Sequence, residues 1–568
     1  TISYGQSKSN KGKEFWIGFM SHIEDTDAGM SLYITSDSNT SGTVSVPGQS
    51  WSTTFTVTAN NLTVVNVPPS KAYINCSDCI QNKGVKVVSG KDVVVFAHHY
   101  EGNKSDATLV LPTRTQGKEY YLMSYQEITS NFGQTGKNTF SVVATKDSTK
   151  IKITPATSLQ TSTGGTFPAN DSFMITLNEG EVYQALAKTA AGDLTGTHVE
   201  VIDTGATANC RTISVFAGST YTRVGGCSSG GGVNSGDNLM EQMFPVTSWG
   251  RRFVLVPALG RSSDNFRFLA LEDGTQVIVF NTSGAPNIGY INAGEYYDVK
   301  NVSVIRNVIA TKPISAAQFQ KTSKCDGGGN RVGDPAMTIL NPLEQTLKDI
   351  TLFSSNYYDI DNHYINVVIP TWGASSFRID GNTATFTSVP NNASYSYTRL
   401  SVTSGNHRLT ANEGFIATAY GEGRYESYGY AAGANIKDLT AVASVSNSAQ
   451  TNEISSCIGR PVAFKGEAEY NVVKWEWFFG DGSMDTVQNP SHVYADTGTY
   501  LAKLYTYKPT FDGCSNYDSS LIEVKIYYKP EARLSMSNIC DSTTVVFIDS
   551  SFIPSPEEYL FTRWTFND

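Results

Sequence analysis

The chain has 568 residues, a formal net charge of −10, 40% hydrophobic residues and 17% charged residues. This length exceeds what one hydrophobic core organises, so several domains are expected. The acidic balance, with Lys and Arg scattered along the chain, excludes the electrostatic footprint of a nucleic-acid-binding protein and a polybasic lipid-binding run. No apolar stretch approaches the roughly 20 residues that span a bilayer. No signal segment precedes Thr1, so the protein is either not exported or has lost its signal.

Composition favours export, because Gly, Ser, Thr, Asn and Tyr are abundant and charged residues are few, as in turn-rich β proteins of cell surfaces. After a polar segment at residues 1–11, the run GKEFWIGFM (12–20) is the first expected strand. Short alternating runs broken by Gly, Asn, Ser and Pro follow it. Only the stretch from Asp237 to Pro245 favours a helical turn. The sequence therefore predicts an all-β fold.

One stretch is repeated along the first three quarters of the chain. GDNLMEQMFPVTSWGRRF (236–253) and GDPAMTILNPLEQTLKDI (333–350) share Gly, Asp, Met and Pro at the same offsets, and a fainter copy contains Pro112. A second run recurs as DVVVFAHHY (92–100), TISVFAGST (212–220), PISAAQFQK (313–321) and GFIATAYGE (414–422). These repeats predict an N-terminal head at 12–437 made of four β-sandwich-like modules, packed in a row or in a ring. The expected modules span about 12–116, 117–249, 250–347 and 348–437.

Composition changes near Lys437, where a different pattern begins. The run KWEWFFGDGSMDTVQNPSHVYADTGTY (474–500) closely resembles a PKD domain, an immunoglobulin-like β-sandwich. We expect one PKD domain at 438–527 and the truncated start of a second at 528–568, where Trp564 and Phe566 repeat the Trp-x-Phe pattern. A strand that stops before its turn predicts that the chain is the front of a longer protein. Cys457 and Cys514 lie near opposite ends of the first PKD domain and are candidates for an inter-strand disulfide.

The head also resembles a known family. The runs VFAGST (215–220), CSSGGG (227–232) and GDNLMEQMFPVTSWGRRFVLVP (236–257) are similar to the IgGFc-binding-protein N-terminal domain family, with weaker similarity over about residues 12–435. In Bacteroidota, similar domains precede PKD arrays in large cell-surface proteins exported by type IX secretion, including gliding adhesins. The resemblance implies surface display and binding, but no particular ligand. It also implies a disulfide between Cys210 and Cys227, because the family tends to have cysteines there.

Candidate chemistry is sparse. Cys76 and Cys79 form CSDC without the second pair of a zinc site or the βαβ setting of a redox motif, so a local disulfide is expected. Cys325 and Cys540 remain without an assigned partner. The run GCSSG (226–230) matches GxSxG, but the glycines after it cannot begin a helix, so a flexible loop is expected. His98 and His99 point to opposite faces of a strand and are expected to be exposed or partly packed, without a shared metal.

Calcium is the one ion for which acidic loops are available. Carboxylates lie close in sequence at Asp25 and Asp27, at Asp359 and Asp361, and at Asp481 and Asp485. A full calcium loop needs more oxygen ligands, so polar turn chemistry is expected at each and no cofactor is predicted. Trp372, in the turn PTWGASS, is the candidate for an exposed ligand contact.

These features together predict a secreted, outer-membrane-associated surface adhesin, acting in attachment or gliding motility, with the head binding a glycan or glycoprotein and PKD domains forming a stalk. Its partners would be that ligand and, during export, the type IX machinery; nucleic-acid binding, membrane insertion and catalysis are not expected. One alternative is an exported glycan- or protein-degrading enzyme, which a convergent pocket of acid, His or nucleophile would favour. Another is a structural component of a surface filament or secretion assembly, which large exposed apolar patches would favour.

Overall fold

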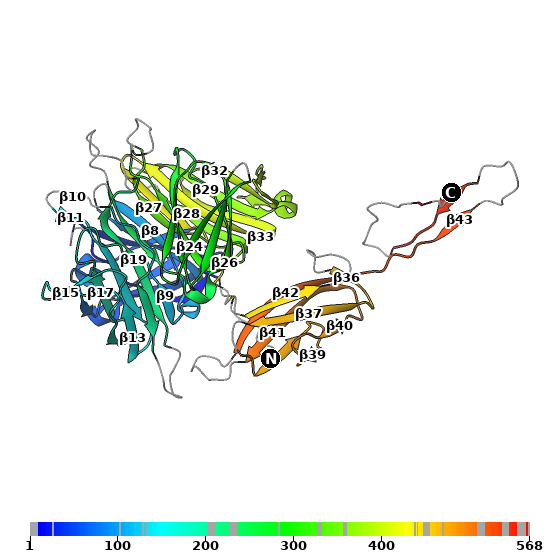
Figure 1. Cartoon of the computed structure of the whole chain (residues 1–568), viewed down its shortest axis with the longest axis horizontal. Coiled ribbons are helices and arrows are strands. Elements are labelled where there is room, and N and C mark those ends of the chain that lie inside the picture. Colours follow the sequence, from blue (N-terminus) through cyan, green and yellow to red (C-terminus); the bar gives the residue numbers. More distant parts are fainter. Residues whose placement is uncertain are drawn as a thin grey trace. The chain divides into compact units, whose positions relative to one another are not determined.

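The computed structural model describes residues 9–24, 28–101, 104–127, 130–131, 134–202, 211–225, 236–281, 284–323, 325, 332–355, 360–436, 439, 441–446, 455–468, 471–507, 517–536, 545–553 and 564–565. Within these residues the fold is all-β, as predicted, and α1 (Pro69–Ala72) is the one α-helix. The chain divides into two compact units, Thr1–Lys437 and Asp438–Asp568. Figure 1 labels some of their strands, numbered in chain order.

Four groups of strands make up the first unit, which we call the head. The first group contains β1 (Gly12–Ile17), β2 (Gly29–Thr35), β3 (Thr40–Val46), β4 (Trp51–Val57), β5 (Leu62–Asn66), β7 (Val85–Tyr100) and β8 (Ser105–Val110). The second contains β6 (Cys79–Gln81), β9 (Glu119–Tyr121), β12 (Asn138–Ala144), β13 (Thr149–Thr154), β16 (Phe173–Leu177), β17 (Val182–Leu186), β18 (His198–Val201), β19 (Ile213–Thr222) and β20 (Asp237–Gln242). Two short pairs accompany it, β10 (Ser130–Asn131) with β11 (Gln134–Thr135) and β14 (Leu159–Gln160) with β15 (Thr166–Phe167).

The third and fourth groups follow the same plan as the first. The third contains β21 (Gly250–Leu255), β22 (Asp264–Ala270), β23 (Thr275–Phe280), β24 (Pro286–Ile291), β25 (Tyr296–Val302), β26 (Arg306–Gln320) and β27 (Ala336–Ile339). The fourth contains β28 (Leu347–Ser354), β29 (Ile360–Pro370), β30 (Arg378–Ile379), β31 (Thr387–Val389), β32 (Asn392–Val402), β33 (Gly405–Gly423) and β34 (Glu426–Ala431). We refer to these groups as modules one to four.

Each module is a sandwich organised by a strand that leaves one sheet and enters the other. The first half of β7 pairs with β1 and β3, and its second half pairs with β2 and β8. The long strands β26 and β33 bend in the same way. In module two this role is divided between β18 and β19. Such a bend forms the corner of a sandwich, and the repeated runs that begin at residues 92, 212, 313 and 414 are the segments that follow it.

The last strands of the four modules meet at the centre of the head. Strand β8 contacts β20, β20 contacts β27, β27 contacts β34, and β34 contacts β8 again. Every residue of these four strands is buried. The chain closes this circle where Asn10 N–H donates to the Ala434 carbonyl at 2.8 Å. The modules therefore form a closed ring.

Carboxylates link the central strands, which do not pair with one another as a sheet. Asp106 of β8 accepts a hydrogen bond from Met240 N–H in β20 at 3.0 Å, and its partners include the backbone N–H groups of Met337 and Gly429. Ser105 donates to Glu426 of β34 at 2.6 Å. Burial raises the pKa of Asp106 well above its usual range, and it does the same for Asp237 and Glu241 in β20. One carboxylate thus reaches three neighbouring modules.

The repeated stretch is a strand followed by a tight turn, so the helical turn expected between Asp237 and Pro245 is wrong. Those residues form β20, and a 3₁₀ turn, η4 (Val246–Ser248), follows Pro245. Every residue of β20 is buried, and packing against neighbouring strands outweighs the local preference for a helical turn. A side chain at Gly117 would place its Cβ 2.4 Å from Pro245 Cβ, and one at Gly250 would lie equally close to Pro342. The Pro that recurs in the repeats therefore marks a turn at the end of a module that packs against the glycine at the beginning of the same module.

The second unit begins with an immunoglobulin-like sandwich of two sheets. One sheet contains β35 (Ala441–Ser446), β37 (Pro461–Ala468) and β40 (Ser491–Val493). The other contains β36 (Ser455–Cys457), β42 (Tyr517–Tyr527), β41 (Gly498–Tyr507), β38 (Lys474–Phe478) and β39 (Met484–Asp485). Trp477, Phe479 and Tyr494 are buried between them, as the Trp-x-Phe pattern predicts. Beyond it, β43 (Leu534–Met536) pairs with β44 (Phe547–Asp549).

Candidate functional site

An open groove lies between modules two and three of the head. Its volume is about 560 Å³, which is within the range of small-ligand clefts. The lining residues are Ala156, Thr157, Asp193 and Thr195 from module two, and Tyr290, Ile291, Gly294, Glu295 and Tyr296 from module three. The module-three residues belong to the end of β24, the start of β25 and the turn between them.

Two glycines bring the modules together beside this groove. The ideal Cβ position of Gly196 lies 2.0 Å from the Gly294 carbonyl oxygen, so any side chain at residue 196 would collide with the neighbouring backbone. Both glycines also have positive φ, +89° and +77°, a conformation that other residues seldom adopt. The close approach of the two backbones therefore requires glycine at residue 196, and the positive φ favours glycine at residue 294.

A buried arginine organises the wall of the groove. Arg267 in β22 is 3% exposed, and its Nε and Nη2 donate to the two carboxylate oxygens of Asp298 at 2.7 and 3.0 Å. Its Nη1 donates to Asp193 Oδ2 at 2.6 Å, to the Ser124 carbonyl at 2.9 Å and to Thr195 Oγ1 at 2.9 Å. Burial disfavours the charge, but Asp193 and Asp298 outweigh burial and raise the pKa of Arg267. The charged guanidinium therefore links modules two and three through hydrogen bonds from its Nε, Nη1 and Nη2 atoms.

Tyr296 rests on this guanidinium. The Arg267 Cζ atom lies 3.7 Å from the centroid of the Tyr296 ring, within the range of a cation–π contact. The tyrosine remains 38% exposed and lines the groove. Tyr290, at the end of β24, is 69% exposed. The groove thus presents one supported aromatic ring and one freely accessible ring.

The charged residues that line the groove are both acidic. Asp193 Oδ1 accepts hydrogen bonds from the N–H and Oγ1 of Thr195 at 2.9 and 2.7 Å, and its Oδ2 accepts a hydrogen bond from Arg267 Nη1. Glu295 Oε2 accepts from Asn292 N–H at 2.9 Å. No Lys or Arg is among the described residues that line the groove. Because Asp193 is fully engaged, the arrangement is suited to holding a ligand more than to transferring protons.

The residues of this groove are not among the candidates expected from the sequence. The available signal at Arg267 is a charge within the largely apolar run NFRFLAL (265–271), a pattern that indicates a buried ion pair but does not identify the partner. The tyrosines flank the turn in IGYINAGEYYDV, where they resemble ordinary strand residues. Trp372, the candidate that was identified, lies in η5 (Thr371–Ser376) of module four and is 59% exposed. It is not among the residues that line the groove, and its contact with a ligand stays a prediction.

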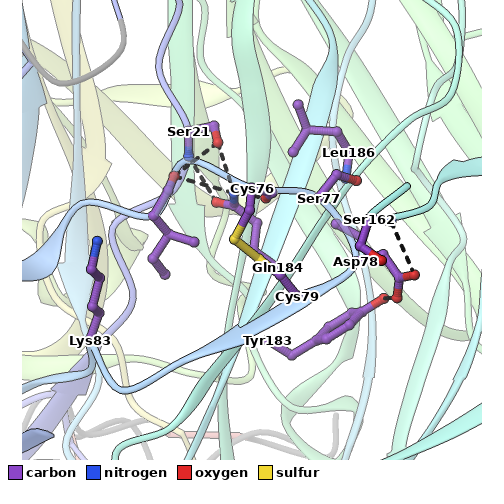
Figure 2. The surroundings of a disulfide bond; sticks show 12 residues. Ser21, Cys76, Ser77, Asp78, Cys79, Lys83, Ser162, Tyr183, Gln184 and Leu186 are labelled. Carbon is purple, nitrogen blue, oxygen red and sulfur yellow. Dashed lines mark hydrogen bonds between the residues drawn. A yellow bond between two sulfur atoms is a disulfide. The ribbon is translucent and has the colours of Figure 1, made fainter. Parts of the chain in front are cut away.

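The expected local disulfide between Cys76 and Cys79 is present, and Figure 2 shows its surroundings. It holds the loop that carries β6, which pairs with β17 of module two so that Cys79 lies opposite Gln184. Gln184 Nε2 donates to the Cys76 carbonyl at 2.6 Å and to Ser21 Oγ at 2.8 Å. Tyr183 O–H donates to Asp78 Oδ1 at 3.1 Å. The disulfide loop therefore joins modules one and two.

The other predicted disulfides have different outcomes. Cys210 and Cys227 lie outside the described residues, so their pairing stays a prediction, while Cys325 is disulfide-bonded. The pairing of Cys457 with Cys514 is wrong, because Cys457 is a free cysteine. Cys457 lies opposite Tyr527, the last residue of β42, whereas position 514 is three residues before the first residue of that strand. At about 3.3 Å per residue the strand is roughly 30 Å long. Three residues of chain span at most about 11 Å, which is too short to reach from the start of the strand to Cys457.

Two further expectations concern histidines and acidic turns. His98 and His99 are 0% and 2% exposed, so the expectation that they are exposed or partly packed is wrong; the second half of β7 lies in the interior of the ring.

Asp481 accepts from Ser483 N–H at 3.0 Å and contacts His492 Nε2 at 2.7 Å. Asp485 accepts from Thr486 N–H, so both aspartates make turn hydrogen bonds. The segments with Asp25, Asp27 and Asp359, and the GCSSG run, lie outside the described residues.

Among the residues that the structure describes, no group of three or more His, Cys, Asp or Glu side chains is arranged to hold a metal ion. Within the same residues, no helix has the length and hydrophobicity needed to cross a membrane.

Comparison with known proteins gives two domain matches. The family model described as IgGFc binding protein matches residues 106–421, and the model described as PKD domain matches residues 446–525. No curated protein matches. Among solved structures, the crystal structure of a Salmonella alpha-2-macroglobulin mutant is 8% identical, with a TM-score of 0.17. That alignment covers 94% of this chain and 41% of the other, and similarity this low carries no argument about fold or function.

Proposed function

Because this chain belongs to the IgGFc binding protein family and continues into a PKD domain, we propose that it is a surface-displayed binding protein, an adhesin whose head captures an extracellular ligand. Both domains are of extracellular type, and the Cys76–Cys79 disulfide suits an oxidising compartment. In this proposal the head binds and the PKD domains act as spacers, without catalysis.

The observation that carries the proposal is the groove between modules two and three. It offers an aromatic ring held by a buried arginine, a second exposed ring and two oriented carboxylates. Asp193 has both oxygens engaged by Thr195 and Arg267, which leaves it unsuited to act as a general acid or base. These features support binding without turnover.

Export by type IX secretion, association with the outer membrane and a role in gliding motility belong to the same proposal. They rest on the combination of an IgGFc-binding head with a PKD domain, which resembles large surface proteins of Bacteroidota. Surface labelling of cells that carry or lack a type IX export component tests this part. Retention of the protein inside the deficient cells is the expected result, and unchanged surface display would contradict it.

The proposed binding is tested with the purified 568-residue chain on an array of glycans, glycoproteins and immunoglobulin, with and without calcium. Saturable binding with the immobilised material left intact is expected. Release of product from the array would overturn the proposal in favour of an exported enzyme. Absence of binding on every surface would overturn it in favour of an assembly component.

A further inference from the structure

We propose that the groove between modules two and three is a saccharide site that takes a neutral sugar, which stacks on Tyr296 and is contacted by Tyr290. This inference rests on the proposed binding function and names its site and ligand class. Three features carry it: a preformed aromatic platform, an acidic lining and the size of the groove.

The platform is fixed before any ligand arrives. Tyr296 is supported by Arg267, and Arg267 is held by Asp193 and Asp298 from two different modules. A side chain that is already ordered loses little conformational entropy on binding. The apolar face of a sugar ring can pack on such a tyrosine, whose hydroxyl adds a polar handle at the ring edge. Tyr290, 69% exposed at the end of β24, is free to approach the same ligand.

The charges favour a neutral sugar over an acidic one. Asp193 and Glu295 line the groove, and the Arg267 guanidinium beside Asp193 is 3% exposed and saturated by carboxylates. Sugar hydroxyls can donate to the Glu295 carboxylate, whereas sialic acid, uronic acid or sulfate would meet like charge. Discrimination against anionic glycans therefore comes from repulsion in the groove itself.

The size of the groove favours a sugar over a protein as the ligand. Its volume of about 560 Å³ is that of a small-ligand cleft. A stable protein partner usually covers about 800 Å² on each side, with a buried aromatic or arginine anchor at its centre. A cationic peptide would be attracted by the two acids, but that attraction is screened by salt, whereas sugar stacking is not.

The test measures binding of the full chain to an array of neutral, sialylated and sulfated glycans in low and high salt. We expect binding to neutral glycans that is insensitive to salt. Tyr290→Ala and Tyr296→Ala should each weaken it about tenfold or more, the usual effect of removing an aromatic anchor. Glu295→Gln should weaken it by a smaller factor. Tyr290→Ala changes a largely exposed side chain, so an unaltered melting temperature shows that its effect is not misfolding.

The matched control is Met174→Ala, which alters an apolar side chain that is 72% exposed in module two and does not line the groove, and it should bind as the unaltered chain does. Trp372→Ala, which alters a residue that is 59% exposed in module four, tests the other candidate contact. Loss of binding in Trp372→Ala with no change in the tyrosine variants would overturn the groove assignment, and so would a preference for anionic glycans or binding that disappears in high salt.

The outcomes also separate this inference from the proposed function. If the chain binds glycoproteins or immunoglobulin equally well before and after deglycosylation, and the tyrosine variants are unaffected, the binding function stands and the saccharide site is wrong. If the chain binds nothing on the array, both are wrong.

Discussion

At the scale of single residues, three buried imidazoles make the head sensitive to acid. His22, His98 and His99 are at most 4% exposed, and burial lowers the pKa of all three. The pKa of His22 falls from 6.5 to about 4, and that of His98 to about 3. His22 also joins two modules, because its Nε2 lies 3.2 Å from Asn238 Oδ1 in β20.

The contribution of these histidines to the stability of the head is therefore expected to fall as the pH falls from about 6.5 to about 4. The unfolded chain binds protons on these histidines at a higher pH than the folded chain does, so their contribution is complete above pH 6.5 and is lost as the pH falls. For His22 the loss is about 3 kcal/mol at the acidic end of this window. The pKa of Asp106, Asp237 and Glu241 is raised, so these acids act oppositely and favour the folded state at low pH.

Urea unfolding of the full chain between pH 4 and 7.5 measures this dependence. Between pH 7.5 and pH 4, the urea midpoint of the variant His22→Gln should fall by less than that of the unaltered chain, because the variant lacks the penalty for protonating His22. Met174→Ala, which alters an exposed side chain that does not titrate, is the control and should keep the pH dependence of the unaltered chain. An identical slope in His22→Gln would show that this imidazole does not govern acid stability.

At the scale of elements, β6 shows how a short loop joins two sandwiches. In the chain this strand lies between β5 and β7 of module one, yet it pairs with β17 of module two, and the Cys76–Cys79 bond constrains the loop from which it starts (Figure 2). Ser77 Oγ also accepts from Leu186 N–H at 3.0 Å. The disulfide thus orders an edge of the neighbouring sheet as well as its own loop.

Replacing both cysteines, Cys76→Ser with Cys79→Ser, should destabilise the head by about 2 kcal/mol, the value for closing a loop of about four residues. Hydrogen exchange should show faster exchange in β6 and in the facing edge strand β17, because their pairing depends on that loop. The matched control is Cys457→Ser, which removes a free thiol in the other unit and should change neither measurement. Unchanged protection of β17 would contradict the proposed role of the loop.

At the scale of the whole molecule, the head is a ring closed by polar bonds at its centre. The strands β8, β20, β27 and β34 are each paired within their own module, and contacts between them depend on side chains. Asp106 accepts from Met240 N–H and has partners on β27 and β34 as well. Buried N–H groups that lose their acceptor bear the full cost of desolvation.

The variant Asp106→Ala should therefore destabilise the head by several kcal/mol, because each buried N–H group that is left without an acceptor costs about 1–3 kcal/mol. The loss should appear in all four modules together, seen as faster hydrogen exchange in β20, β27 and β34. Asp349→Ala removes a half-exposed pair with Arg408 and should cost at most about 1 kcal/mol. Faster exchange confined to module one would contradict a role for Asp106 in closing the ring.

Much of this architecture was visible in local patterns. The alternating runs predicted an all-β chain, the repeated Gly, Asp, Met and Pro marked strands that recur in the head, and the Trp-x-Phe run marked the PKD sandwich. The errors have a common cause. The residues from Asp237 to Pro245 form a strand, and His98 and His99 are buried, because four modules surround the centre of the ring. Burial of this kind depends on neighbours far away in the sequence.

The strands, their repetition and the two domain types can be predicted from the amino-acid sequence, because alternation, turn residues and short motifs act over a few neighbouring residues. The closure of the ring, the sandwich that each loop contacts and the place where a ligand can lie depend on how the modules pack. Arg267 meets Asp193, 74 positions earlier in the chain, and Ser105 meets Glu426, 321 positions later. Such contacts leave no spacing signal in the chain, since their geometry arises when separate modules pack together.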